Sequence, residues 1–294
     1  MRSGFVAVVG RPNVGKSTLV NLMVGTKVSI TSSRPNTTRH RILGILHRPD
    51  AQVVFVDTPG LHRPRSTLGA RLNETATGSL TDVDMILVLV DAAAAVGPGD
   101  RTVLEHALRE VRRGDEPPKL VVVINKIDKA TGDQILERLV SAEAAVKAIF
   151  PTEAVDYFPV SARSGQGVED LTAFILDSLE EGPPFFPDDV VTDTPEALWV
   201  AELVREQLLA RTHDELPHSI SCQVTEWEWP HIRCEIIVER DSQKGIVIGK
   251  GGEILKAVGI AVRETLPEGA YLDLHVKVEK HWQERDEMLN RLGY

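Results

Sequence analysis

The segment that most constrains the fold is Gly10-Arg-Pro-Asn-Val-Gly-Lys-Ser17, which fits the pattern G-x-x-x-x-G-K-[S/T] at every fixed position. The apolar run Phe5–Val9 before it predicts a strand, and residues Thr18–Val24 after it predict a helix. A glycine-rich loop between a strand and a helix N-terminus points successive backbone N–H groups at one anion. The segment therefore predicts a phosphate-binding loop and a β-α order for the start of the chain.

Every residue of this loop is a candidate nucleotide ligand. We expect the Lys16 ammonium to reach the β- and γ-phosphates and the Ser17 hydroxyl to ligate Mg²⁺. The alternative is a glycine-containing turn that matches by chance, and the flanking strand and helix argue against it. The predicted nucleotide-binding residues of this segment are Gly10, Arg11, Pro12, Asn13, Val14, Gly15, Lys16, Ser17 and Thr18.

A second segment, Asp57-Thr-Pro-Gly60, follows the apolar run Val53–Val56. An Asp at the end of a strand beside the phosphate loop can hold Mg²⁺ through water, and Gly60 leaves its N–H free to approach the γ-phosphate. Thr37 and Thr38 precede this strand, and we favour Thr38 as the hydroxyl that closes over Mg²⁺. The predicted Mg²⁺ ligands are Ser17, Thr38 and Asp57, and Asp57, Thr58, Pro59 and Gly60 join the nucleotide-binding set.

A third segment, Asn125-Lys-Ile-Asp128, follows the apolar run Leu120–Ile124. We expect it to bind the base of the nucleotide. A carboxylate at Asp128 can accept hydrogen bonds from the N1–H and the exocyclic amine of guanine, and adenine offers no such pair of donors. We expect Asn125 to tie this loop to the phosphate loop and the stem of Lys126 to lie over the base. After the run Tyr157–Val160, Ser161 and Ala162 complete the predicted pocket with backbone N–H groups.

The residue after Gly60 is Leu61, at the position where Ras-type GTPases place a water-orienting Gln. Because a leucine side chain cannot position water, we expect slow hydrolysis unless another group takes this role. Asn13 is a candidate, since the loop resembles that of GTPases in which an Asn here helps to bind a K⁺ ion that stabilises transition-state charge. The predicted catalytic residues are Lys16, Thr38, Gly60 and Asn13.

Apolar runs alternate with helical patterns through Glu181, with a further strand at Met85–Val90. The helical patterns cover residues 101–112, 133–149 and 168–179. This alternation predicts an α/β fold, a doubly wound sheet of parallel strands with helices on both faces. Residues 182–195, rich in Pro and acidic side chains, predict a linker. The predicted domains are therefore 1–181 and 196–294.

The C-terminal part changes pattern. Residues Glu196–Arg211 predict an amphipathic helix, and residues 219–227, 232–238 and 271–278 alternate as strands, which together predict a small α+β domain. Gly249-Lys-Gly-Gly252 fits a G-x-x-G loop between two helices, where glycines let a sugar-phosphate backbone approach. A glycine hinge is the alternative. The predicted RNA-binding residues are Lys244, Ile248, Gly249, Lys250, Gly251, Gly252 and Lys256.

Composition limits the other functions. The length of 294 residues suggests about two domains, and the net charge of −10 argues against coating nucleic acid by bulk electrostatics. Cys222 and Cys234 have no neighbouring metal-ligand set, so we expect buried thiols in a reducing cytoplasm. No apolar run approaches the roughly 20 residues of a spanning helix, and Met1 is followed almost at once by the first strand, so no signal peptide is expected. Three tryptophans, Trp227, Trp229 and Trp282, are either stacking platforms or packing residues.

The combination of segments resembles the Era family of bacterial GTPases, in which a Ras-like GTPase domain precedes a type II KH domain. The resemblance rests on the four nucleotide segments, on Thr37-Thr-Arg-His-Arg41 and on Val247–Gly252, and it covers essentially the whole chain. It implies GTP and Mg²⁺ as ligands, GTP hydrolysis, binding of the 3′ end of 16S ribosomal RNA and action in maturation of the small ribosomal subunit. It further implies a cytoplasmic protein with peripheral contact to the inner face of the membrane, and we expect a monomer.

Three alternatives stay open at this point. A P-loop kinase would need an acceptor site, and none is evident. Ribosomal GTPases such as EngA carry two GTPase domains, whereas this chain has one phosphate loop. A plain RNA-binding module, in which the nucleotide is only structural, would bind RNA equally in the GTP, GDP and nucleotide-free states.

Overall fold

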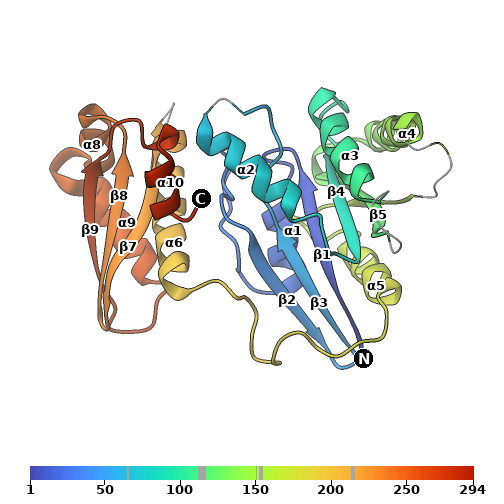
Figure 1. Cartoon of the computed structure of the whole chain (residues 1–294), viewed down its shortest axis with the longest axis horizontal. Helices are drawn as coiled ribbons and strands as arrows, with labels where there is room; N and C mark the ends of the chain where they lie inside the picture. The colour runs from blue at the N-terminus through green and yellow to red at the C-terminus, as the bar shows by residue number, and fades with distance from the viewer. Residues whose placement is uncertain (65, 112–116, 150, 152–154, 213–215) are drawn as a thin grey trace. The chain divides into compact units, whose positions relative to one another are not determined.

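The computed structural model describes residues 1–64, 66–111, 117–149, 151, 155–212 and 216–294 (Figure 1). Its contacts divide the chain into two compact units. The first unit comprises residues 1–31, 38–63 and 71–193, and the second comprises residues 32–37, 64–70 and 194–294. Among the described residues, no helix has the length and apolar character needed to cross a membrane.

The first unit is built on a six-stranded sheet with the order β2-β3-β1-β4-β5-β6. Strands β1 (Arg2–Gly10), β3 (Ala51–Asp57), β4 (Met85–Asp91), β5 (Lys119–Asn125) and β6 (Asp156–Val160) are parallel. Strand β2 (Ile42–Arg48) runs antiparallel to β3 at one edge. The five strands that the sequence predicted are therefore all present and parallel, whereas the antiparallel edge strand β2 was not predicted.

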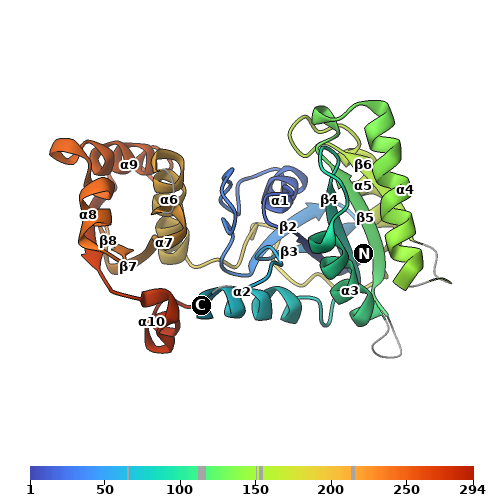
Figure 2. The ribbon, with the colours of Figure 1, turned by 90° about the horizontal axis from the view of Figure 1, so that it is seen from above.

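Helices cover both faces of this sheet, as the alternation predicted (Figures 1 and 2). Helices α1 (Lys16–Val24) and α5 (Val168–Ser178) pack against the face that presents Val6 and Val8. Ala7 and Val9 point to the other face, because successive residues of a strand alternate. That second face packs against α2 (Thr67–Gly78), α3 (Pro98–Val111) and α4 (Gly132–Ile149). Helix α2 was not predicted, and Arg112, the predicted end of α3, lies outside the described residues.

Residues 182–193, most of the predicted linker 182–195, belong to the first unit and are bonded along it. The backbone N–H of Gly182 donates to the carbonyl of Met1 (2.8 Å), and the N–H of Ile45 in β2 donates to the carbonyl of Val191 (2.9 Å). The buried Gln52 side chain accepts from the N–H groups of Phe185 and Phe186 at 2.7 and 3.0 Å. These bonds fix the path of the segment.

The second unit is an α+β domain, as predicted. Its sheet has the order β7-β8-β9, in which β7 (Ser221–Glu228) is antiparallel to β8 (His231–Val238) and β8 is parallel to β9 (Tyr271–Val278). The parallel pair needs a crossover connection, and α8 (Asp241–Ile248) and α9 (Glu253–Arg263) supply it. The described residues of this unit also form α6 (Glu196–Arg211), α7 (Leu216–Ser219) and α10 (Asp286–Arg291), with short 3-10 turns at Lys250–Gly252 and Trp282–Glu284.

A hydrophobic cluster holds this second unit together, with Val200 and Val204 of α6 and Val258 of α9 packed on the inner face of the sheet. Cys222 and Cys234 are buried in this unit as free thiols. Trp282 is completely buried, and its indole N–H donates to the carbonyl of Ser219 at 3.0 Å. Packing is therefore the role that the structure gives to Trp282.

Candidate nucleotide-binding site and G-x-x-G loop

The predicted nucleotide segments follow four of the five parallel strands of the first sheet. The phosphate loop follows β1, Asp57 ends β3, Asn125 ends β5 and Ser161 follows β6. Because these strands are parallel, their carboxyl ends share one edge of the sheet, where open α/β folds bind ligands. Segments separated by more than a hundred residues are therefore brought to one place.

The phosphate loop adopts a conformation that needs glycine. Gly15 has φ 99°, and Asn13 also lies in the left-handed region with φ 64°. A Cβ atom at Gly15 would lie 2.4 Å from Nδ2 of Asn125, and a Cβ atom at Gly60 would lie 2.6 Å from the backbone nitrogen of Pro12. Both glycines thus permit close contacts between segments that any side chain would force apart.

Lys16 lies folded over this loop. Its ammonium donates to the carbonyls of Gly10 and Arg11, both at 3.3 Å. Burial lowers the pKa of Lys16 to about 8, and the negative charge of Asp57 opposes that shift. A buried ammonium held by weak carbonyl contacts is suited to an anionic ligand, because phosphate oxygens would supply the missing counter-charge.

Three oxygen-bearing side chains meet at the predicted Mg²⁺ site. The hydroxyls of Ser17 and Thr38 are 2.8 Å apart, and Thr38 donates weakly to Oδ2 of Asp57 at 3.4 Å. Burial raises the pKa of Asp57, and its Oδ1 atom is buried without a hydrogen-bond partner. An orphaned carboxylate oxygen beside two hydroxyls fits Mg²⁺, which prefers hard oxygen ligands and keeps several waters. The Thr37 hydroxyl instead donates to the carbonyl of Arg34 at 2.7 Å.

Asn125 links three loops at the base end of the site. Its Nδ2 donates to the carbonyl of Val14 at 2.7 Å, and its Oδ1 accepts from the N–H of Ala162 at 2.9 Å. This geometry is the tie to the phosphate loop that the sequence predicted. The Lys126 ammonium donates to the carbonyl of Asn13 and to Asp91, at 2.5 and 2.6 Å.

Asp128 is positioned to receive a base. Its Oδ1 accepts from the Ser161 hydroxyl at 2.7 Å, and this bond is the main reason why the pKa of Asp128 is lowered. The carboxylate is exposed and stays ionised at neutral pH. An accessible acceptor held in one orientation can take hydrogen bonds from two donors of a guanine.

Sequence reasoning missed several supporting residues. The Ser29 hydroxyl donates to Oδ2 of Asp57 at 2.7 Å, and nothing in its local sequence marks it. Asp91 ends β4, so its position at a strand end was an available signal. Leu61 is only 4% exposed and packs in the core, so its side chain takes no part at the site.

The G-x-x-G loop of the second unit joins α8 to α9. Gly249, Gly251 and Gly252 have φ 75°, 64° and 83°, a region that favours glycine. A Cβ atom on Gly251 or Gly252 would meet no atom within 4 Å, so that side of the loop is open to an approaching backbone. Of the other predicted RNA-binding residues, Lys250 and Lys256 are exposed, and Lys244 and Ile248 are half-buried.

This fold and these sites define a P-loop GTPase domain joined to a KH domain, and comparison with known proteins agrees. A family model described as a 50S ribosome-binding GTPase matches residues 5–126, and a KH-domain model matches residues 215–283. GTPase Era of Mycobacterium avium (strain 104) is 45% identical over 304 residues, covering 100% of this chain and 99% of that protein. GTPase Era of Mycobacterium tuberculosis (strain ATCC 25177 / H37Ra) is 46% identical over 303 residues, covering 99% and 98%. The chain belongs to the Era family of GTPases, which are GTP-hydrolysing enzymes.

Two solved structures are similar over the full length. A variant of Aquifex aeolicus Era bound to GDP and AlF4⁻ has a TM-score of 0.90 and 38% identity, covering 100% of this chain and 99% of that one. Era in complex with MgGDPNP and nucleotides 1506–1542 of 16S ribosomal RNA has a TM-score of 0.91 at the same identity and coverage.

Proposed function

We propose that this GTPase binds the 3′ end of 16S ribosomal RNA through its G-x-x-G loop, in a manner controlled by the bound nucleotide, and acts in maturation of the small ribosomal subunit. The observation that carries the proposal is the presence, on one chain, of the GTP site and an open glycine loop that contains the exposed Lys250 and precedes the exposed Lys256 of α9. The similar Era structure with MgGDPNP and 16S ribosomal RNA supports it.

In the nucleotide site, we propose that Ser17, Thr38 and Asp57 would hold Mg²⁺, whose positive charge would offset that of the phosphates. Lys16 binds the phosphates, and Asn125 and Asp128 position the base. Thr38 and Gly60 are the residues whose arrangement depends on the γ-phosphate, which is the usual basis of a GTPase switch. If GTP tightens RNA binding, RNA must tighten GTP binding by the same factor.

The test is the affinity for a short single strand with the 16S 3′-end sequence, measured with a non-hydrolysable GTP analogue, with GDP and without nucleotide. Salt is held constant, because phosphate contacts make affinity salt-dependent. Binding that is about tenfold tighter with the GTP analogue, or about 1.4 kcal/mol of coupling, is expected. Equal affinity in all three states would contradict the switch. Lys250→Ala should weaken binding, whereas Lys147→Ala on α4 is the matched control.

We further propose that a K⁺ ion near Asn13 supplies transition-state charge, because the buried Leu61 cannot orient water. Turnover should then be faster in K⁺ than in Na⁺ buffer, and Asn13→Ala should remove the difference. Equal turnover in both buffers would contradict a role for K⁺. The cytoplasmic location, the monomeric state and peripheral contact with the inner face of the membrane are proposed from the family resemblance alone.

A further inference from the structure

The second unit contains a cavity of about 480 Å³ near the C-terminal end of α9, whereas the G-x-x-G loop precedes the N-terminal end of this helix. It lies between the start of α6, the β7–β8 hairpin and the segment that follows α9. The residues that matter for its chemistry are Glu196, Val200, Trp227, Trp229 and Leu266. We call it the tryptophan cavity. It shares no residue with the predicted RNA-binding set.

A β-bulge directs Trp227 into this cavity. The register of β7 against β8 shifts between Val224 and Glu226, so that Trp227 lies opposite the buried Ile232. Residues directly opposite in an antiparallel pair share one face of the sheet. Regular alternation from Val224 would have placed Glu226 on the helix-covered face instead. The bulge thus turns an indole toward the cavity and a carboxylate away from it, as bulges beside binding sites often do.

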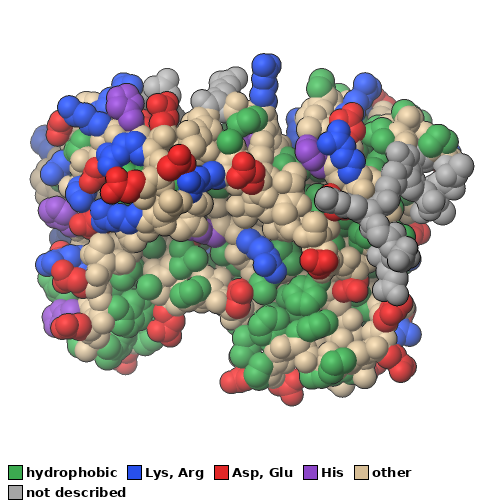
Figure 3. Space-filling model, viewed as in Figure 1, with side chains coloured by type: hydrophobic (Ala, Val, Ile, Leu, Met, Phe, Trp, Pro, Cys, Tyr) green, Lys and Arg blue, Asp and Glu red, His purple; other side chains and the backbone are tan. Residues whose placement is uncertain are grey.

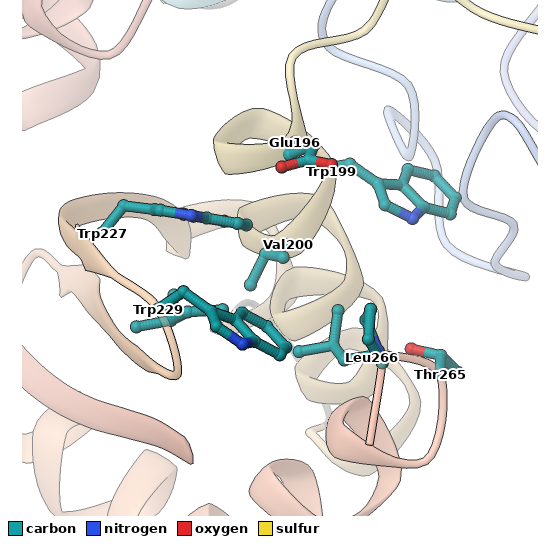
Figure 4. Close-up of a pocket in the computed structure, with 9 residues that line it drawn as sticks. Glu196, Trp199, Val200, Trp227, Trp229, Thr265 and Leu266 are labelled. Carbon is teal, nitrogen blue, oxygen red and sulfur yellow. The ribbon is translucent and has the colours of Figure 1, made fainter. Parts of the chain in front are cut away.

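Two indoles remain open to solvent at this site. Trp227 is 37% exposed and Trp229 is 51% exposed, whereas Trp282 in the same unit is fully buried. Figure 4 shows the rings of Trp227 and Trp229 on either side of a space with Val200 between them, and Leu266 beside Trp229. The ring of Trp199 points away from that space. The receptive surface is therefore the pair of indoles and the aliphatic side chains beside them.

The charge around the cavity is negative. Among the described residues that line it, Glu196 is the ionisable one, and no Lys, Arg or His takes part. Glu228 follows Trp227 closely in sequence, and Glu264 and Glu268 flank the lining segment after α9; all three are exposed, as is Arg263, which precedes Glu264. Glu226, turned away from the cavity, is ion-paired with Arg233 at 2.7 Å. Figure 3 shows hydrophobic side chains bordered by Asp and Glu at this end of the unit, whereas Lys and Arg gather toward α8. Such surroundings repel a sugar-phosphate backbone and attract a cation.

We propose that the tryptophan cavity binds the guanidinium group of an arginine on a basic segment of a partner protein. Aromatic faces attract a cation placed over them, and a nearby carboxylate adds a counter-charge. A guanidinium is planar and weakly hydrated, so it stacks against an indole more readily than an ammonium does. Basic arms are common in proteins that bind nucleic acid, and such an arm would be at hand when the GTPase is bound to RNA, a step that rests on the function proposed above.

The test uses the full-length chain and a short peptide of alternating Arg and Gly, at fixed low salt. Its control is the same peptide with citrulline, which has nearly the shape of arginine but no charge. The indole N–H signals in a ¹H–¹⁵N spectrum report on the site, and those of Trp227 and Trp229 should move on titration, while that of Trp282 should stay. Trp229→Ala and Glu196→Gln should each weaken peptide binding, Trp229→Ala by about tenfold. Tyr271→Ala removes an exposed ring outside the cavity and should change nothing.

Equal binding of the citrulline peptide would overturn the proposal, because the site would then be merely apolar. Glu196→Gln offers a second test that does not alter packing, since Glu196 is exposed. Movement of the same two indole signals by a single-stranded oligonucleotide, with no effect of the Arg peptide, would instead assign the cavity to unpaired bases.

Discussion

Asn125→Ala should destabilise the nucleotide-free GTPase unit and weaken GDP binding. The Asn125 side chain satisfies the carbonyl of Val14 and the N–H of Ala162, and it is 1% exposed. Alanine removes both bonds and leaves two buried backbone groups without partners. At about 1–3 kcal/mol for each unsatisfied group, the expected loss is about 2–6 kcal/mol in the free energy of unfolding. Since a domain has about 5–15 kcal/mol in total, this loss is large.

The position of the tryptophans provides the assay. All four tryptophans, Trp199, Trp227, Trp229 and Trp282, lie in the second unit, so their fluorescence reports on that unit alone. Urea unfolding is followed in parallel by far-ultraviolet circular dichroism, which senses both units. With an m-value of about 2 kcal/mol per molar urea, the transition of the GTPase unit should move down by about 1–3 M. The fluorescence transition should stay where it is.

The matched control is Thr102→Ala, which removes an exposed bond from the Thr102 hydroxyl to its own helix and should cost less than about 0.5 kcal/mol. An Asn125→Ala protein with unchanged stability and unchanged GDP affinity would refute the reasoning. A fluorescence transition that moves as far as the dichroism transition would show that the effect is not local to this site.

Three further predictions address the other groups. Burial lowers the pKa of Lys16 from 10.5 to about 8, so between these pH values the unfolded chain binds one proton more than the folded chain. The free energy of unfolding of the nucleotide-free protein should therefore rise by about 3 kcal/mol from pH 8 to 10.5. Lys16→Met should abolish this rise, as measured by urea titrations at the two pH values. Asp128→Asn should weaken GTP binding by about tenfold to a hundredfold in calorimetry, because charged hydrogen bonds to guanine are lost; unchanged affinity would exclude Asp128 from the base pocket. Gly252→Ala should lower the free energy of unfolding by about 1 kcal/mol, measured by thermal unfolding, because only the positive φ of this residue opposes a side chain. The same change should abolish RNA binding, because the added methyl group would keep the RNA backbone away from the loop. Retained RNA binding would show that the RNA backbone does not approach Gly252 closely.

The fold was predictable where the sequence shows continuous apolar runs and where a nucleotide segment directly follows such a run. Each buried parallel strand is a continuous apolar run, and each nucleotide segment follows such a run, so the sequence placed the site at one edge of a doubly wound sheet. Strand β2 was missed because Ile42–Arg48 lies beside the predicted switch threonines and contains Gly44 in its interior, which weakens a strand pattern. Helix α2 has few apolar residues in Thr67–Gly78, and its burial depends on tertiary contacts that sequence periodicity does not report.

The sequence predicted the individual residues of the nucleotide site, but not the hydrogen bonds that hold these residues in place. Motifs name the groups expected to touch a nucleotide, so Lys16, Asn125 and Asp128 could be proposed from spacing. Ser29 holds Asp57 only because the chain between them folds back, and no local pattern encodes that contact. Asp91 could have been found as a carboxylate at a strand end, although its bond to Lys126 could not. The bulge that turns Trp227 inward was likewise invisible, since one extra residue changes the face of every later side chain.

The close approach of Gly15 to Asn125 has a consequence for redesign of base specificity. The loop that reads the base and the loop that binds the phosphates are in contact at a position that leaves no room for one additional carbon atom. A loop grafted from an enzyme specific for another base would therefore have to present a side chain in the place of the Asn125 amide without striking Gly15, before its own recognition residues could matter. Changes to the two loops must be selected together, and libraries that vary either loop alone should yield few folded binders.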